Sequence, residues 1–537
     1  MSLISDYMLI SMSYISIHGR NNPWTYIFTL FVLEGQLKRK IPPLKIHIQR
    51  CPPVSADSMT LSGILQLTPH NIDHFVNDVV STVTTHLSSH LLGEQKPPIL
   101  AIVHGPSRSG KTSTIQQLRT VFNELLSSHL LIIVSPSPSG AMTLGATALH
   151  GFLALGEETI DRSRYIIIDD CSTLASSMLD SLNNRCPAIE GADAGAHFGG
   201  RSVLLFGDLH QMPPPLGVDT LWSPRFGAGG TFASFQHAFT LRPQANTLDQ
   251  WQKVCAEVRK GGISKAVCEE LNRHALKDGP DSYVAETSFH HDVIFITPSS
   301  SCHRHWNNQL ASVFAKKNKC TLYTSVAEDD LVFNSFLRLP VTDAHKLQSF
   351  NDDHATLLHD IPLCFGMPVT IDDGIWGTVE DFVVDEREDL PTPRKPETTL
   401  KYPFTQVRIR VNQLLLDSGF VTTPFLTIRP KATMFKVPLA NHGLEVVEVH
   451  RYQLPLQPRF AIMERDATGL TFPNVVLDTS AGMINYLSPY GALSRVAQNG
   501  RLAITCPLTP SGLGRFGEVE RLKDCVRRIE GFSMPQL

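Results

Sequence analysis

The sequence predicts an α/β protein with parallel β-sheets, interrupted in its second half by a β-rich part. Three observations lead to this fold class. Short apolar runs alternate with helical signals over residues 97–259, a pattern typical of a parallel sheet covered by helices. A second set of apolar runs begins at 293–297. Between 345 and 445 the pattern changes to short strands and a charged, proline-rich loop.

The elements of the first sheet follow from buried runs and their flanks. The apolar run at 97–105 ends in glycine and precedes a helix predicted at 113–126. Further buried strands are predicted at 130–134, 165–169 and 202–206. Because strand and helix signals alternate, we expect the strands to be parallel, with helices on both faces.

A second set of elements surrounds the β-rich part. A helix is predicted at 248–259, because Gly261 and Gly262 form a stop signal directly after it. Apolar runs at 475–478 and 502–505 return to the buried-strand pattern. These runs join the strand that begins the second set, so the sequence indicates a second parallel sheet.

The bulk composition restricts the class of protein. A length of 537 residues allows about three to four domains and several cores. A net charge of −4 excludes a generally basic protein, so any nucleic-acid contact must come from local patches. The 10 cysteines include no CxxC pair, which argues against zinc and fits an intracellular protein. No apolar run approaches the roughly 20 residues that span a bilayer, so no membrane association is expected.

A phosphate-binding loop is predicted where the first strand ends. GPSRSGKT at 105–112 fits GxxxxGK[ST], in which backbone N–H groups face phosphates. Lys111 would neutralise the β- and γ-phosphates, and Thr112 would ligate Mg²⁺. The predicted cofactors are therefore ATP and Mg²⁺. The predicted ATP-binding residues of this loop are Gly105, Pro106, Ser107, Arg108, Ser109, Gly110, Lys111 and Thr112.

Two further motifs follow buried strands. IIIDD ends the run at 166–170, where Asp169 suits Mg²⁺ and Asp170 suits a base that orients water. In FGDLHQMPPP at 206–215, Gln211 can hydrogen-bond a γ-phosphate. Carboxyl ends of parallel strands meet at one edge of a sheet, so these groups are expected near the phosphate-binding loop.

The ordered set of motifs resembles PIF-family, RecD-like DNA helicases of superfamily 1, a group that includes helicases of Helitron transposons. The resemblance covers about residues 61–510. HFGGRSVLLFGDLHQMPPP at 197–215 matches the family's third motif nearly throughout, and IIIDDCSTLASSMLDSL at 166–182 matches the second. YGALSRV at 490–496 matches the sixth, which implies that Arg495 completes the ATP site from the second lobe.

Two other stretches resemble parts of the family pattern. SPSPSGAMTLGATALHGF at 135–152 resembles the first DNA-contact motif, and ITPSSSCHRHWNNQL at 296–310 resembles the start of the second motor domain. The resemblance implies a catalytic set of Asp170, Gln211 and Arg495. It implies DNA contacts by Pro136, Ser137, His150, Thr297 and Pro298.

The family resemblance also implies two RecA-like P-loop NTPase lobes with an inserted small SH3-like β domain. The implied activity is ATP-driven movement from 5′ to 3′ on single-stranded DNA with unwinding, and the implied partners are single-stranded DNA and duplex junctions. Nuclear location, or alternatively mitochondrial, and roles in DNA repair, recombination and telomere maintenance are expected. The expected parts are an unassigned extension at 1–60, a first motor domain at 61–250, a linker and second-domain start at 251–344, the β domain at 345–445, and the remainder at 446–537.

The chain departs from the family pattern at several positions. The family's Glu is Asp170, its adenine-reading Gln is Asn71, and the fourth-motif arginine falls on Ala245, with Arg242 as a nearby candidate. In the fifth motif, residues 466–469 read Asp-Ala-Thr-Gly where the family has Lys-Ser-Gln-Gly. Two rivals therefore stay open: a degenerate paralogue or transposon relic that binds without unwinding, and an ATPase switch that acts on protein partners.

Overall fold

The computed structural model describes most of the chain after its first 73 residues. The predicted extension at 1–60, Asn71 and Ala245 lie outside the described residues. The described residues are 74–154, 158–193, 195–215, 218–223, 230–242, 250–261, 264–276, 293–333, 337–340, 357–371, 374–389, 395–418, 421–438, 446–480, 482–483, 486, 488–509 and 519–532.

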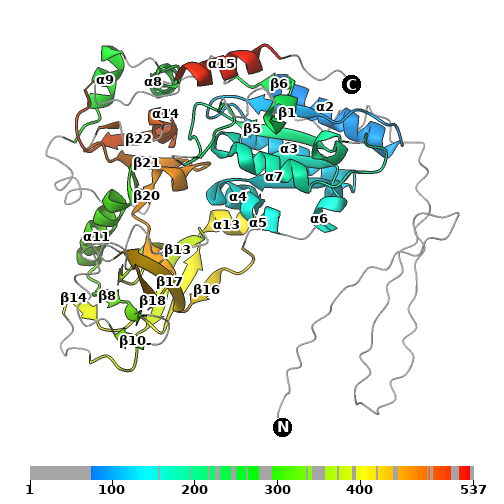
Figure 1. The fold of residues 1–537 in the computed structure, drawn as a ribbon. Coiled ribbons are helices and arrows are strands. Elements are labelled where there is room, and N and C mark those ends of the chain that lie inside the picture. Colours follow the sequence, from blue (N-terminus) through cyan, green and yellow to red (C-terminus); the bar gives the residue numbers. More distant parts are fainter. Residues whose placement is uncertain are drawn as a thin grey trace, which may run out of the picture. The chain divides into compact units, whose positions relative to one another are not determined.

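The first sheet has six strands in the order β3-β2-β4-β5-β1-β6, and every neighbouring pair is parallel (Figure 1). Its central strands are runs of Ile, Val and Leu that are buried along their whole length, as expected of a sheet covered on both faces. The strands are β1 (Leu100–His104), β2 (Leu131–Ser135), β3 (Thr147–Ala148), β4 (Tyr165–Ile168), β5 (Ser202–Gly207) and β6 (His237–Thr240).

Helices cover both faces of this sheet. Ile102 belongs to one buried cluster, whereas its neighbours Ala101 and Val103 belong to another, as the side-chain alternation of a strand requires. The helices of this part are α2 (His74–Leu91), α3 (Lys111–Glu124), α4 (Pro138–Leu144), α5 (Leu149–Ala154), α6 (Glu158–Asp161) and α7 (Ser176–Arg185). The C-terminal helix α15 (Val519–Glu530) adds Leu522, Val526 and Ile529 to the cluster of Ile102.

The second sheet has four strands in the order β20-β7-β21-β22, again all parallel. Helix α8 (Gln250–Arg259) precedes this sheet in the chain, and its residues Val254 and Val258 pack in the same cluster as Ile294 and Leu477 of the sheet. The strands are β7 (Val293–Thr297), β20 (Ala461–Met463), β21 (Phe472–Leu477) and β22 (Val496–Ile504). The helices are α8 (Gln250–Arg259), α9 (Lys265–Asn272), α11 (Ser300–Lys317) and α14 (Pro489–Leu493).

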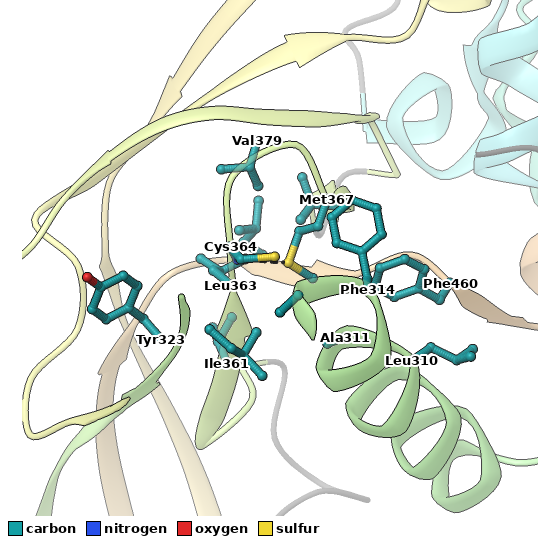
Figure 2. Packing of buried hydrophobic residues seen from close by; sticks show 14 of the residues in the cluster. Leu310, Ala311, Phe314, Tyr323, Ile361, Leu363, Cys364, Met367, Val379 and Phe460 are labelled. Carbon is teal, nitrogen blue, oxygen red and sulfur yellow. Dashed lines mark hydrogen bonds between the residues drawn. The ribbon is translucent and has the colours of Figure 1, made fainter. Parts of the chain in front are cut away.

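The chain between α11 and β20 forms three smaller sheets, with strand orders β11-β8-β14, β10-β9-β18-β17 and β16-β15-β13-β12-β19. Figure 2 shows Phe314 of α11 and Phe460 beside Met367 in the cluster that joins this β-rich part to α11. The strands are β8 (Leu322–Val326), β9 (Glu328–Phe333), β10 (Leu337–Pro340), β11 (Asp360–Leu363), β12 (Pro368–Ile371), β13 (Trp376–Val383), β14 (Glu397–Leu400), β15 (Gln406–Val411), β16 (Phe425–Ile428), β17 (Lys431–Pro438), β18 (Val446–Gln453) and β19 (Leu456–Pro458). The domain boundaries given above stay a prediction.

The β-rich part also packs against the first sheet's α4. Trp376 is buried with Met142 of α4 and with Leu470, which follows the fifth motif. Gly145 ends α4 with a φ of 57°, and a Cβ on it would lie 2.2 Å from the Ser418 carbonyl oxygen. Glycine is therefore required there by both conformation and space. None of the helices in the described ranges combines the length and apolar character needed to cross a bilayer.

A buried ion pair ties β18 to β9. Arg451 donates through Nε and Nη2 to the two carboxylate oxygens of Asp329, at 2.8 and 2.7 Å, and its side chain is 0% exposed. We expect Arg451→Ala to destabilise the fold by about 3–5 kcal/mol, because Asp329 would keep a buried charge without its partner. Thermal unfolding of the variant checks this expectation. The control is Arg387→Ala, whose pair with Glu328 is exposed and whose loss should leave the melting temperature almost unchanged; equal losses would contradict the argument.

Candidate nucleotide site between two parallel sheets

Three neighbouring strands of the first sheet end at one edge. Strand β4 pairs with β5, and β5 pairs with β1, all parallel, so the residues after each strand lie close together. The structure thereby brings together most of the predicted nucleotide site. The groups at this edge are the loop at 105–112, Asp169 and Asp170, and Asp208 and Gln211.

The loop at 105–112 has the backbone of a phosphate cradle. A Cβ on Gly105 would lie 2.4 Å from the Ser109 hydroxyl and 2.7 Å from the Leu241 carbonyl, so only glycine fits. Gly110 has a φ of 89° where the loop enters α3. The buried Ser109 hydroxyl has no hydrogen-bond partner in the described chain. These features fit an anion held by backbone and hydroxyl donors at the N-terminus of α3.

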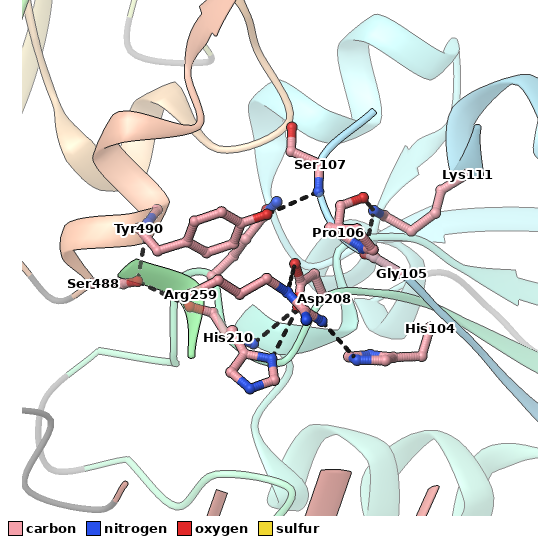
Figure 3. A network of polar contacts seen from close by, with 12 residues as sticks. His104, Gly105, Pro106, Ser107, Lys111, Asp208, His210, Arg259, Ser488 and Tyr490 are labelled. Atoms are coloured by element: carbon pink, nitrogen blue, oxygen red, sulfur yellow. Dashed lines mark hydrogen bonds and ion pairs between the residues drawn. The ribbon is translucent and has the colours of Figure 1, made fainter. Parts of the chain in front are cut away.

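Lys111 turns back onto its own loop. Its Nζ donates to the carbonyl oxygens of Gly105 and Pro106, both at 2.7 Å (Figure 3). Burial lowers the pKa of Lys111, while Asp208 and Asp169 act in the opposite direction. The ammonium group is therefore held beside the phosphate cradle by weak, neutral acceptors. Thr112 is exposed in the first turn of α3, so its hydroxyl is accessible to a metal ion.

The adjacent acids are both buried, with Asp169 7% and Asp170 8% exposed. Burial raises the pKa of Asp169, and the neighbouring Asp170 raises it further. Burial also raises the pKa of Asp170, whereas Arg495 and Lys111 lower it. Two carboxyl groups held this close favour a cation between them, since only then can both ionise. Asp169 and the accessible Thr112 hydroxyl thus form a donor set that fits Mg²⁺.

Asp170 is held in a narrow space. Its φ of 54° lies in the left-handed region that side-chain-bearing residues rarely adopt. Its Oδ2 has no hydrogen-bond partner among the described residues. A Cβ added at Gly140 of α4 would lie 2.7 Å from this oxygen, and one at Gly469 would lie 3.1 Å from it. The two glycines therefore shape the pocket that contains the carboxyl group.

Arg495 reaches this edge from the second sheet. Its Nη2 donates to Gln211 Oε1 at 3.0 Å. Burial lowers the pKa of Arg495, while the charge of Asp170 acts in the opposite direction. Backbone carbonyls hold the guanidinium: Nε donates to Gly491 O, and Nη1 donates to Ala467 O and Leu470 O. Backbone carbonyls in and beside the fifth motif thus position Arg495. The altered side chains at 466–468 leave these carbonyl contacts in place.

A second arginine was not identified from the sequence. Arg259 of α8 donates through Nε and Nη2 to the Asp208 carboxylate, with contacts of 3.0–3.2 Å, and its Nη2 lies 3.0 Å from His104 Nε2 (Figure 3). Burial alone would raise the pKa of Asp208, but Arg259 and the His210 hydrogen bond hold it well below its usual range. In the sequence, Arg259 reads only as the end of an amphipathic helix.

Three hydroxyl groups add contacts between the two sheets. The Ser107 N–H donates to the Tyr490 hydroxyl at 2.9 Å, and Ser488 Oγ donates to the His210 carbonyl at 3.0 Å (Figure 3). Ser139 Oγ of α4 donates to the Thr468 carbonyl at 2.8 Å, which links the predicted DNA-contact motif to the fifth motif. Arg108 also donates to the Val496 carbonyl.

The predicted DNA-contact residues have different environments. His150 is exposed and Pro136 and Pro298 are half-buried, so all three are accessible. Ser137 is buried and accepts from the Gly140 N–H as the N-cap of α4. Thr297 ends a buried strand, so its side chain is 0% exposed and its hydroxyl donates to the Ile462 carbonyl. Arg242, the fourth-motif candidate, is exposed after β6.

Comparison with known proteins was made at the levels of sequence and fold. No protein-family model and no curated protein matches the chain. Solved structures do match. The chain is 17% identical to the Pif1 helicase from Candida albicans, with a TM-score of 0.57, covering 86% of this chain and 99% of that one.

Two more structures have the same fold. The Bacteroides Pif1 helicase in complex with ADP-AlF3 and single-stranded DNA is 16% identical, with a TM-score of 0.54 over 84% of this chain and 98% of that one. A structure of two coordinating Pif1 helicases at forked duplex DNA is 14% identical, with a TM-score of 0.56 over 87% and 100%. The predicted fold class is thereby confirmed, and the chain has the two-lobed, RecA-like fold of the Pif1 helicases.

Proposed function

We propose that the chain is an ATP-dependent DNA helicase or translocase of PIF type that moves from 5′ to 3′ on single-stranded DNA. The observation that carries the proposal is the contact of Arg495 with Gln211 beside Asp170. A charge supplied from the second sheet to the phosphate site of the first is the arrangement by which an arginine couples hydrolysis to the closing of two lobes.

The residues of the site suit ATP and Mg²⁺, which would supply the scissile phosphoanhydride and the charge that neutralises its oxygens. Lys111 would exchange its two carbonyl acceptors for phosphate oxygens, a stronger charge-assisted contact. Thr112 and Asp169 would hold the metal ion. Asp170 would accept the proton of the attacking water, and its unpartnered Oδ2 is available for this.

DNA is the proposed partner, as single strands and duplex junctions. Neighbours of the same fold were solved with single-stranded DNA and with forked duplex DNA. In this chain the bond from Ser139 to the Thr468 carbonyl supports a path from a DNA-contact motif to the carbonyls that hold Arg495. Location in the nucleus, or alternatively the mitochondrion, and roles in repair, recombination and telomere maintenance are proposed from the family resemblance alone.

The second candidate function is a degenerate paralogue that binds nucleotide and DNA without unwinding. It is favoured by the shortened acid at Asp170 and by the negative charge at Asp466. DNA-stimulated ATP turnover separates the candidates, with Lys111→Ala as the inactive control. Stimulation by single-stranded DNA supports the motor, nucleotide binding without turnover supports the degenerate form, and turnover indifferent to DNA indicates an ATPase switch.

Arg495→Ala should lower the rate of ATP turnover by about a thousandfold, because the charge that stabilises the transition state would be lost. ATP affinity should change by less than about tenfold, because ground-state contacts remain on the first sheet. Single-turnover hydrolysis and equilibrium ATP binding measure the two effects. Arg501→Ala, at an exposed position of β22, is the matched control and should leave both unchanged. Comparable losses of affinity and rate would contradict the assigned role.

Gly140→Ala should slow ATP turnover by about 100-fold while sparing ATP affinity. The new methyl group would press on Asp170 Oδ2, and a shift of about 1 Å in a reacting group has an effect of this order. Gly151→Ala is the control, since nothing lies within 4 Å of a Cβ at that helical position. If both variants turn over ATP equally fast, the carboxyl group of Asp170 does not act as the base.

Replacing Asp466 by Lys should strengthen the coupling of DNA to ATP turnover. Asp466 is half-exposed, with 48% of its side chain accessible, and removing its charge near phosphates relieves a repulsion of roughly 1–4 kcal/mol at about 4 Å. We expect a larger stimulation of turnover by single-stranded DNA and an unchanged rate without DNA. A titration of DNA at several salt concentrations measures it. If single-stranded DNA stimulated ATP turnover equally in the variant and the native chain, Asp466 would have no part in this coupling.

A further inference from the structure

Three potential metal ligands converge behind the phosphate-binding loop. His104 ends β1, and Asp208 and His210 follow β5, so the pairing of these two strands brings the three side chains together. One ligand atom from each lies within 4.8 Å of the other two. Figure 3 shows the three side chains together. His104 is 1% and Asp208 1% exposed, whereas the side chain of His210 is 13% exposed.

His104 is in the protonation state that a metal ligand requires. Its Nε2 lies 3.0 Å from Arg259 Nη2, and a guanidinium has donors only, so this Nε2 must offer a lone pair. The Nδ1 of His104 then carries the proton, and this buried atom has no partner in the described chain.

The positively charged guanidinium of Arg259 contacts His104 and Asp208 in this cluster. The Asp208 carboxylate takes its Nε and Nη2, and Asp208 Oδ1 also lies 3.3 Å from His210 Nδ1. The negative charge and the His104 lone pair are therefore both directed at the position of the guanidinium. A metal ion at this position would replace one cation by another beside the Asp208 carboxylate, so that carboxylate would keep a partner.

We propose that a divalent transition-metal ion of the zinc type binds His104 Nε2, the Asp208 carboxylate and His210 in place of the Arg259 guanidinium. Zinc bonds to nitrogen and oxygen of about 2.0–2.2 Å place tetrahedral ligands roughly 3.4 Å apart, so small side-chain movements close the present spacing. Two imidazoles and one carboxylate select zinc over Mg²⁺, which prefers oxygen ligands. Water would complete the coordination on the side of His210.

Metal binding would act on the contact between the two sheets. Arg259 lies on α8, whose Val254 and Val258 pack with the second sheet, whereas the three ligands belong to the first. An ion that displaces Arg259 therefore breaks one ion pair between them and leaves the contact of Arg495 with Gln211. The expected consequence is inhibition of any nucleotide turnover that requires the two sheets to close.

The direct test is a titration of the intact, metal-free chain with Co²⁺ and Zn²⁺ in the presence of Mg²⁺. Co²⁺ should produce the visible absorption of a low-symmetry site, which Zn²⁺ should abolish. His210→Gln should weaken this binding by about 10-fold to 100-fold, because one of three protein ligands is lost. His129→Gln, at an exposed histidine elsewhere on the first sheet's surface, is the matched control and should leave the spectrum unchanged.

Arg259→Ala separates this proposal from adventitious binding to surface histidines. Without the competing guanidinium, Co²⁺ should bind at least about tenfold more tightly, and His210→Gln added to it should reverse the gain. Melting temperatures measured without metal show whether each variant folds. If His210→Gln does not fold, the comparison of Co²⁺ affinity between the native chain and Arg259→Ala still tests the proposal. Equal Co²⁺ affinity in the native chain and in Arg259→Ala would overturn the proposal, as would a spectrum insensitive to His210→Gln.

Discussion

Compensation of buried charge at one edge of the first sheet is the constraint on which the rest of the site depends. Asp169, Asp170 and Asp208 are each at most 8% exposed, and buried carboxylates require cations or hydrogen bonds. From the first sheet, Lys111 favours the charged forms of Asp169 and Asp170, and its ammonium group is bonded to backbone carbonyls. The missing positive charge comes from the second sheet, through Arg259 and Arg495. The close approach of the two sheets is thus favoured by electrostatics as well as by packing.

The two arginines reach the same motif in different ways. Arg259 forms an ion pair with Asp208, whereas Arg495 donates to the neutral amide of Gln211 and is fixed by three backbone carbonyls. Hydrogen bonds to backbone carbonyls do not depend on which side chains those residues carry. These contacts hold Arg495 in place although residues 466–468 lack the Lys, Ser and Gln of the PIF-family pattern. Of these three residues Asp466 is exposed, whereas Ala467 and Thr468 are buried.

Two donors of the phosphate-binding loop are hydrogen-bonded to protein acceptors. Lys111 is bonded to the Gly105 and Pro106 carbonyls, and the Ser107 N–H is bonded to the Tyr490 hydroxyl. A phosphate would replace these contacts by charge-assisted ones, which are roughly twice as strong. Since Tyr490 belongs to α14, which packs with the second sheet, a phosphate that displaces its hydroxyl would also remove one contact between the two sheets. The same chain segment carries Arg495, so nucleotide and arginine would move together.

Local patterns in the sequence determined the strands, the helices beside them and the motifs at their ends. The strand predicted at 293–297 is β7 to the residue, and the buried runs of the first sheet lie within one to three residues of β1, β2, β4 and β5. These succeed because burial on both faces of a parallel strand leaves a continuous apolar run, and because a phosphate-binding loop needs its glycines at set spacings. The parallel order then implied that Asp169, Asp170 and Gln211 meet.

Only the tertiary structure decided which distant residues complete the site. Arg259 reads in sequence as a helix end, His104 and His210 as two of 22 dispersed histidines, and Gly140 as one small residue in a motif. Their roles arise from contacts between separate segments of the chain, as between Arg259 and Asp208, which lie 51 positions apart. The environment of Thr297 is a further example, since its motif match says nothing of its pairing with strand β20. Periodicity and spacing encode neighbours along an element, whereas the approach of two sheets depends on the packing of every element between them.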